Sequence, residues 1–294
     1  MAPARISLLT AVVLVGAVAG CGSGRPPQAG PSGSGATSSS TSRPTSPPVP
    51  TTTSVPAGTP TTPAPPTTTV RPPTATAPPT LDPALSGRDW TRIPTSQHVV
   101  ALTFDAGANA NGVPSILATL RSTGVPATFF LTGRFAESFP TSSRSIATAG
   151  HRLGNHSVDH PDFTTLSDAQ IRTQVLNAAT TIRTIAGRDP SPLFRFPFGA
   201  TNTRTIAAVN GVGYVPVRWT VDTLGWKGSA GGQSTATVLA RVLAALTPGE
   251  IVLMHVGANP DDGSTLDADT LPAMITALRD RGYGFVTLDA LIAR

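Results

Sequence analysis

The sequence predicts an α/β domain that folds as a closed or nearly closed parallel barrel, and three observations support this class. Across residues 88–294, apolar runs rich in β-branched and aromatic residues alternate with helical patterns. Six or seven such units in succession favour a barrel over an open sheet. Polar residues also stand at or near the ends of three apolar runs, at Asp105, Asp222 and His255, and barrel enzymes build their sites at that face.

Each predicted element rests on its own pattern. Five apolar runs are predicted as buried strands, at residues 99–105, 127–133, 215–222, 250–257 and 284–291. Six periodic stretches are predicted as helices, at residues 113–124, 143–150, 167–187, 203–213, 235–246 and 271–282. Glycine adopts the left-handed conformation of a helix C-terminus without steric cost. Helix ends are therefore expected at Gly124, Gly150, Gly187, Gly211 and Gly282.

Residues 1–21 are predicted to be a signal peptide. Arg5 precedes an apolar run at residues 6–20, which is shorter than the roughly 20 residues that span a bilayer as a helix. The run ends in "VAGC", which resembles a bacterial lipobox, and Cys21 is the only cysteine, so no intramolecular disulfide can form. A lipid on Cys21 would tether the protein to the outer face of the cytoplasmic membrane. The alternative is an ordinary cleavage site with an incidental cysteine.

Residues 22–87 are dominated by Pro, Thr, Ser and Gly and are predicted to form a disordered linker, because they have almost no apolar surface to bury. In polyproline geometry such a segment reaches on the order of 150 Å, which suits a tether inside a thick cell wall. The charge of residues 88–294 is nearly balanced, and no basic patch or arginine-rich helix indicates nucleic-acid binding. The folded domain, residues 88–294, is expected to be a monomer.

Several polar residues of the domain indicate metal-assisted chemistry. In "GNHSVDHPDF", His156 and His160 are four residues apart, and two imidazoles so spaced can reach one divalent cation, although such pairs also arise by chance. Arg195 lies in the apolar run "LFRFPFGA", where an unpaired charge is costly, so a carboxylate partner is expected. With Asp222, Trp226 and His255, these residues supply the groups needed for metal-assisted hydrolysis of an amide or ester.

Five motifs occur in a characteristic order: "TFDAG", "HSVDH", "RFPFG", "VDTLGW" and "LMH". Together they resemble the motifs of the polysaccharide deacetylases, the NodB-homology group of carbohydrate esterase family four, across essentially the whole domain. The resemblance implies a deformed (β/α)7 barrel. It also implies a divalent metal, zinc first with cobalt or manganese as alternatives.

The resemblance also implies roles for individual residues. Asp105 matches the catalytic base that takes a proton from the water attacking the acetamide carbonyl, and a carboxylate at a strand end agrees with that role. His255 matches the acid that protonates the departing amine, and Arg195 matches the residue that orients the base. His156 and His160 match metal ligands. Trp226 matches the aromatic wall beside the substrate. Pro197 and Phe198 are also expected to bind substrate.

The sequence departs from the family pattern at two positions. Where relatives have a second aspartate that binds the metal, this chain has Ala106, which offers no donor atom. Asn109, Asn111 or Asp105 itself are the candidates to supply the missing ligand. Relatives also commonly have an aspartate just before the tryptophan, where it tunes the acid histidine, and here that position is Gly225. The candidate to replace it is Asp222.

The leading functional hypothesis is an enzyme, lipid-anchored outside the cytoplasm and facing the cell wall, that removes N-acetyl groups from amino sugars of peptidoglycan. The long tether favours peptidoglycan over free chitin because it is the polymer within reach. One alternative is a NodB-like domain that has lost catalysis and only binds cell-wall glycan. Another is an O-acetyl esterase acting on polysaccharide.

Overall fold

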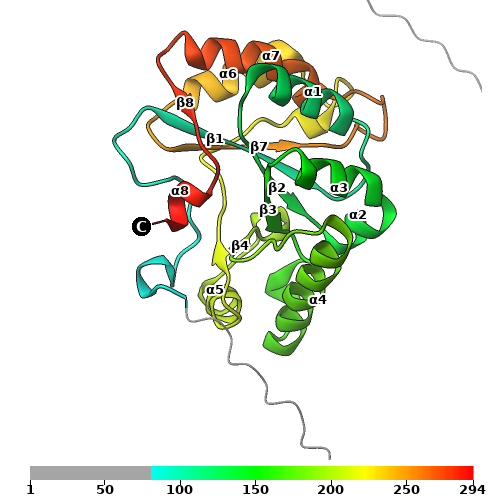
Figure 1. Cartoon of the computed structure of the whole chain (residues 1–294), viewed down its shortest axis with the longest axis vertical. Helices are drawn as coiled ribbons and strands as arrows, with labels where there is room; N and C mark the ends of the chain where they lie inside the picture. The colour runs from blue at the N-terminus through cyan, green and yellow to red at the C-terminus, as the bar shows by residue number, and fades with distance from the viewer. Residues whose placement is uncertain (1–80, 294) are drawn as a thin grey trace, which may run out of the picture. The chain divides into compact units, whose positions relative to one another are not determined.

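The computed structural model of the chain describes residues 81–293 (Figure 1). The predicted signal peptide, Cys21 and most of the predicted linker lie outside the described residues. The described domain begins earlier than the predicted boundary at residue 88, because Leu85 is buried against Ile93 and Val217. The backbone oxygen of Leu85 also accepts a hydrogen bond from Nε1 of Trp90, at 3.2 Å.

One parallel sheet forms the centre of the domain. Its eight strands are β1 (Val99–Ala106), β2 (Thr128–Leu131), β3 (Arg152–Asn155), β4 (Leu193–Phe194), β5 (Val215–Pro216), β6 (Val221–Asp222), β7 (Glu250–His255) and β8 (Gly284–Phe285). They pair in the order β5-β4-β3-β2-β1-β7-β6, with β8 added against β1. The sequence of strand and helix units confirms the predicted deformed (β/α)7 barrel.

The deformation lies between β5 and β6, which are joined without a helix. Instead, this connection forms backbone hydrogen bonds to strands on both sides of the gap. Val217 N–H donates to the backbone oxygen of Phe194 on β4, at 2.8 Å, and Thr220 N–H donates to that of Ile251 on β7, at 2.9 Å. The segment between β5 and β6 therefore bonds to β4 and β7, the strands next to the two ends of the sheet.

Helices surround the sheet (Figure 1). They are α1 (Val113–Thr123), α2 (Gly133–Ser138), α3 (Pro140–Thr148), α4 (Asp168–Ala186), α5 (Thr203–Asn210), α6 (Thr235–Ala245), α7 (Leu266–Arg279) and α8 (Asp289–Ile292). Four single 3₁₀ turns are η1 (Pro83–Leu85), η2 (Phe163–Thr165), η3 (Pro197–Gly199) and η4 (Gly225–Lys227). Helices α1, α6 and α7 pack together on one side, and α4 and α5 lie at the opposite end of the domain. Within residues 81–293, no helix is both long and apolar enough to cross a membrane.

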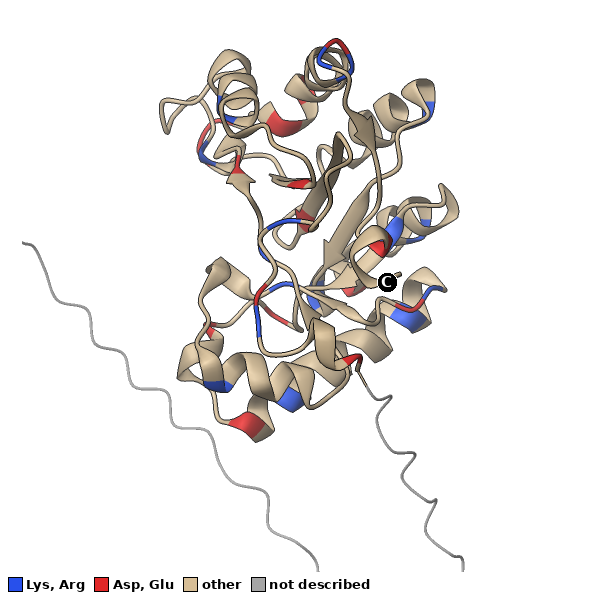
Figure 2. Cartoon of the chain, turned by 90° about the vertical axis from the view of Figure 1, so that its left-hand side faces the viewer, with Lys and Arg blue, Asp and Glu red and all other residues tan. Residues whose placement is uncertain are grey.

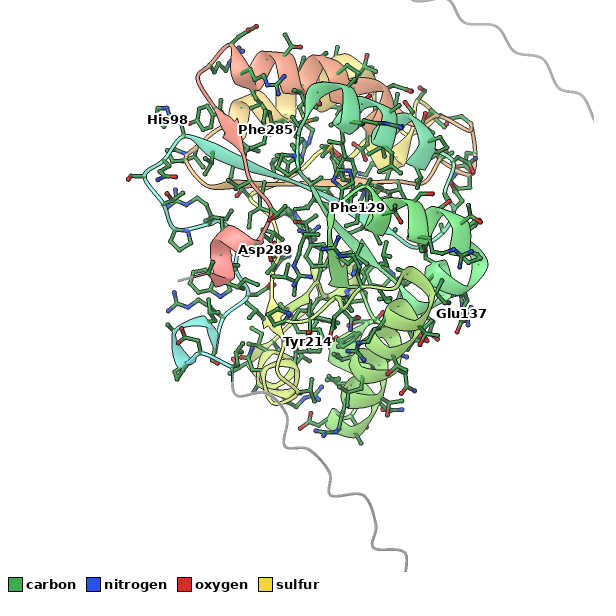
Figure 3. All side chains as sticks on the ribbon, viewed as in Figure 1. His98, Phe129, Glu137, Tyr214, Phe285 and Asp289 are labelled. Atoms are coloured by element: carbon green, nitrogen blue, oxygen red, sulfur yellow. The ribbon has the colours of Figure 1, made fainter. Side chains whose placement is uncertain are left out.

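The core follows from the alternation of side chains along the strands. On β1, Leu102, Phe104 and Ala106 belong to the apolar layer between the sheet and its helices. Phe129 of β2 lies in the same layer, which side chains fill densely (Figure 3). Asp105 stands on the opposite face of β1, and that alternation directs its carboxylate into the barrel mouth.

Most predicted elements are present, and the differences lie in the division of two predicted strands and in where some helices begin and end. The predicted strand at 215–222 is two short strands, β5 and β6, and the one at 284–291 is β8 followed by α8. Helix α7 begins at Leu266 rather than at residue 271. Gly124 and Gly187 end their helices in the left-handed conformation as predicted, whereas Gly211 is right-handed with φ −62°. Charged residues of both signs are interspersed over helices and loops (Figure 2).

Candidate active site

A cavity of about 590 Å³ opens at the carboxyl ends of the strands. It brings together residues that are far apart in the sequence. Of the predicted site residues, seven line it: Asp105, His156, His160, Phe198, Asp222, Trp226 and His255. The sequence analysis missed other lining residues, among them Arg134, Phe196 and Trp219.

Asp105 is held at the cavity floor by a buried arginine. The Nη1 of Arg195 donates to Oδ1 of Asp105 at 2.8 Å, and the arginine side chain is fully buried. Arg195 also donates from Nε to the backbone oxygen of Val217, at 3.1 Å, and from Nη2 to that of Arg218, at 2.9 Å. Its guanidinium lies 4.1 Å from the centre of the Phe130 ring. The predicted carboxylate partner of Arg195 is therefore confirmed. Arg195 lies beneath the cavity floor and holds Asp105 in place.

These contacts keep Asp105 ionised. Burial alone would raise the pKa of the carboxyl, but the charges of Arg195, His156 and His255 and the hydrogen bond from Arg195 bring the pKa below its ordinary value. A carboxylate that stays ionised in a nearly buried position can accept a proton from a neighbouring group.

His156 follows directly after β3, and its ring is fixed by the backbone. Nδ1 lies 2.9 Å from the backbone oxygen of Arg195, which can only accept, so Nδ1 carries the proton. The lone pair of the neutral ring is then on Nε2, which lies 3.4 Å from Oδ2 of Asp105. Burial is the main cause that lowers the pKa of His156 and favours this neutral form.

His160 stands against His156, with ring centroids 4.8 Å apart, and against Phe198, at 4.4 Å. Burial and the neighbouring His156 lower its pKa to about 4. Among the described residues, the non-glycine residues with left-handed backbone are Ser157, His160, Phe198 and Leu224. All four lie in the loops around the cavity. Such strained backbone conformations cost on the order of 1 kcal/mol or more each and commonly serve a function.

The donor set for a metal contains two imidazoles. Ala106 is fully buried in the apolar layer and offers no ligand atom. Asn109 is not free to replace it, because Oδ1 accepts from Ala258 N–H at 2.8 Å and Nδ2 donates to the Ala258 oxygen at 2.9 Å. Asn111 is exposed and lies outside the cavity lining.

In the described part of the chain, no group of three or more His, Cys, Asp or Glu residues is placed to hold a metal ion. Two neutral imidazoles nevertheless suit a divalent cation. One of them points its lone pair at a carboxylate oxygen, and a cation beside both would satisfy them. The site thus fits a divalent cation through His156 and His160, with one protein ligand fewer than a typical catalytic zinc.

His255 lies opposite Asp105 on the neighbouring strand, since the two residues are register partners of β7 and β1. Its neighbouring carboxylate differs from the expected one. Asp222 accepts hydrogen bonds from Leu224 N–H, at 2.9 Å, and from Trp226 Nε1, at 3.4 Å. The carboxylate beside the His255 ring belongs to Asp267, whose Oδ2 is 3.8 Å from Nδ1.

The sequence analysis missed Asp267. A signal was available in helix α7, where Asp267 occupies the same apolar stripe as Leu271, Met274 and Leu278 at helical spacing, and all are buried. A carboxylate in such a stripe needs a polar partner. The sequence does not reveal which one, because its partners lie on β7 and in the loop after β6.

Two aromatic side chains border the cavity. Phe198 is 68% exposed and Trp226 is 45% exposed, although both are large and apolar. Pro197, predicted to bind substrate, is buried and lies outside the cavity lining. Its place at the start of η3 instead positions Phe198, because the fixed φ of proline suits the first position of a helical turn.

The fold and site define the class of the protein. Residues 92–217 match the family model for polysaccharide deacetylase. A chitooligosaccharide deacetylase of Azorhizobium caulinodans is 33% identical over 205 residues, which cover 67% of this chain and 96% of that relative. The chain therefore belongs to the polysaccharide deacetylase family, a family of hydrolases acting on carbon–nitrogen bonds outside peptides.

Further relatives differ in what they are reported to do. A peptidoglycan-N-acetylglucosamine deacetylase of Bacillus cereus is 33% identical over 198 residues, 67% of this chain and 70% of the relative. A solved peptidoglycan N-acetylglucosamine deacetylase has a TM-score of 0.63 and 32% identity, covering 69% of this chain and 92% of that one. A CE4 family pseudoenzyme from Bacillus anthracis has a TM-score of 0.64 and 29% identity, covering 70% of this chain and 69% of that one.

Proposed function

We propose that this protein is a metal-dependent hydrolase that removes N-acetyl groups from amino sugars of cell-wall polysaccharide, with peptidoglycan as the substrate. One observation carries the proposal. A buried, ionised Asp105 and a histidine, His255, face the same cavity from register positions of adjacent strands. A base and an acid so placed can act on opposite sides of one amide bond.

Asp105 acts as the base. Its carboxylate takes a proton from water as the water oxygen attacks the acetamide carbonyl carbon. Arg195 holds the carboxylate in one orientation through the bond at 2.8 Å and is therefore a positioning residue. Because both are nearly or fully buried, little solvent competes for the carboxylate.

His255 acts as the acid. As the carbon–nitrogen bond breaks, the imidazolium gives its proton to the sugar nitrogen, which leaves as an amine while the acetyl group leaves as acetate. Burial lowers the pKa of His255, but its interaction with Asp267 and the charges of Asp105 and Asp222 outweigh burial and raise the pKa overall. The raised pKa favours the protonated ring that the acid role requires.

His156 and His160 would hold the divalent cation. When bound, the cation polarises the acetamide carbonyl and favours deprotonation of water. The backbone oxygen of Arg195 orients the His156 ring by accepting from Nδ1, the usual arrangement around a metal-binding histidine.

The exposed rings of Phe198 and Trp226 support a sugar substrate. Pyranose faces can stack on aromatic rings, and two exposed aromatic rings at the mouth of one cavity are suited to that contact. The choice of peptidoglycan is supported by the relatives named for it and by the predicted lipobox and linker. We propose that Cys21 carries the lipid anchor and that the Pro/Thr/Ser-rich segment between Cys21 and the folded domain carries the domain into the wall.

The second candidate is a glycan-binding module without catalysis. The likeness to a pseudoenzyme and the missing ligand at Ala106 favour it. A pure binding module has no need for a buried Asp105 and Arg195 pair, which is costly to assemble. The retained pair therefore favours the enzyme.

The test uses the full-length protein with defined peptidoglycan fragments and chitooligosaccharides. Released acetate is measured after chelation and after addition of zinc, cobalt or manganese. Acetate release that depends on added metal supports the proposal. Binding of the fragments without acetate release under any metal supports the binding module instead.

A further inference from the structure

The carboxylate of Asp267 occupies the space beside Gly225. A Cβ built on Gly225 would overlap Oδ1 of Asp267 and lie 2.6 Å from its Cγ. No residue larger than glycine fits at position 225 while Asp267 keeps this position. Gly225 has no left-handed φ, so what excludes a side chain there is the space that Asp267 fills.

Asp267 is bound to both elements that carry the acid side of the cavity. Its Oδ2 accepts a hydrogen bond from the backbone N–H of His255, at 2.8 Å, and its Oδ1 accepts one from Oγ1 of Thr223, at 2.6 Å. The side chain is 4% exposed. Helix α7 is thereby attached to the end of β7 and to the loop after β6.

The same carboxylate faces the ring of His255. Oδ2 lies 3.8 Å from Nδ1, which is an ion-pair distance and longer than a hydrogen bond. Nδ1 is buried and has no hydrogen-bond partner among the described residues. A small rotation of the ring would convert the contact into a hydrogen bond, as often happens when substrate binds.

We propose that Asp267 is the positioning residue of the acid His255, supplied by α7 in the space left by the glycine at position 225. The proposal rests on the proposed function, because it takes His255 to be the acid. With Nδ1 directed at the carboxylate, Nε2 is the ring nitrogen left to deliver a proton. Asp267 thus performs the task expected of Asp222, which instead binds Leu224 and Trp226.

Other titratable groups near His255 also influence its pKa. Asp105 faces it from β1, Asp222 from the end of β6, and the imidazoles of His156 and His160 from the loop after β3. None of these groups is altered by a substitution in α7. An effect of changing Asp267 can therefore be attributed to that carboxylate.

The variant Asp267→Asn removes the charge with little change in shape. Its amide oxygen can accept from His255 N–H, and its amide nitrogen can donate to Thr223 Oγ1, so both buried hydrogen bonds have a replacement. We expect kcat to fall at least tenfold with KM changed less than twofold. The alkaline limb of the kcat profile should move to lower pH, because the imidazolium loses the carboxylate beside it. Asp269→Asn, an exposed acid on the same helix, is the matched control and should match the parent.

A readout independent of activity separates this inference from the proposed function. The pKa of the His255 ring is measured by NMR in the metal-free full-length protein, with His255→Gln to assign its signal. A pKa lowered in Asp267→Asn supports the pairing even if no substrate is turned over, and that combination would count against the proposed function alone. An unchanged pKa, or an unchanged kcat profile in an active enzyme, overturns the inference.

A double variant tests the replacement itself. Asp267→Ala should lower kcat, and Gly225→Asp added to Asp267→Ala should restore part of it, because the new carboxylate enters the vacated space. Gly225→Asp alone should melt at lower temperature, since two carboxylates then crowd one position. A folded double variant, by circular dichroism, that is no more active than Asp267→Ala would contradict the replacement.

Discussion

Replacing Arg195 with Met should destabilise the domain strongly. Arg195 is fully buried, forms three hydrogen bonds, and is the cation beside a nearly buried Asp105. Removing one partner of a buried ion pair leaves an uncompensated charge and typically costs about 3–5 kcal/mol. For a domain of this size each kcal/mol corresponds to about 2–4 °C, so the melting temperature should fall by about 10 °C.

The pH dependence identifies the cause. In the parent the lowered pKa of Asp105 contributes stability above the pKa of the unfolded chain, and this contribution is lost as pH falls through the folded pKa. Without Arg195, burial raises the pKa of Asp105, so the destabilisation should be larger at pH 7 than at pH 4. Thermal unfolding by circular dichroism measures both. Arg195→Met combined with Asp105→Leu should lose less than the sum of the single changes. A melting temperature within about 2 °C of the parent at pH 7 would refute the argument.

Three further changes have defined outcomes. Burial raises the pKa of Glu250 from 4.5 to about 7, so the free energy of unfolding should fall as pH rises through that window. Glu250→Gln should therefore raise the free energy of unfolding by on the order of 2 kcal/mol at pH 8 and leave it unchanged at pH 4. Equal gains at both pH values in denaturant titrations would contradict this prediction. Ala106→Asp should lower the melting temperature, because the new carboxylate would lie in the apolar layer where Ala106 is fully buried, and an unchanged melting temperature with tighter zinc binding in calorimetry would mean that the carboxylate reaches the cavity instead. Cys21→Ser should move the protein from the membrane to the soluble fraction, and continued membrane association would exclude the lipid anchor.

The fold was largely predictable because its central strands are continuous apolar runs. β1 and β7 are buried on both faces, so they read as strands without any tertiary information. β3 was missed, because "RLGN" contains a single large apolar residue. Its Gly154 is required by packing, since a Cβ there would meet the Phe130 ring of β2 at 2.5 Å. That contact is not visible in the sequence.

Site residues were predictable from the sequence where the residue type and its position at the end of a strand were enough to identify them. Asp105 and His255 stand at strand ends, and the cost of an unpaired buried charge predicts that Arg195 has a carboxylate partner without saying which residue it is. The neighbour of His255 was not predictable, because Asp267 and Gly225 come from different elements and their relation is steric. Asn109 failed as a ligand for a similar reason, since its amide is fully used in binding Ala258.

Acetate release by the parent and by Asp105→Asn tests the central claim most directly. The account predicts that the full-length protein releases acetate from peptidoglycan fragments in the presence of added divalent metal. Asp105→Asn should bind the same fragments but release acetate at least about 10²-fold more slowly, the usual scale for losing a positioned base. Equal rates for the two proteins, or no release by the parent with zinc, cobalt or manganese, would contradict it.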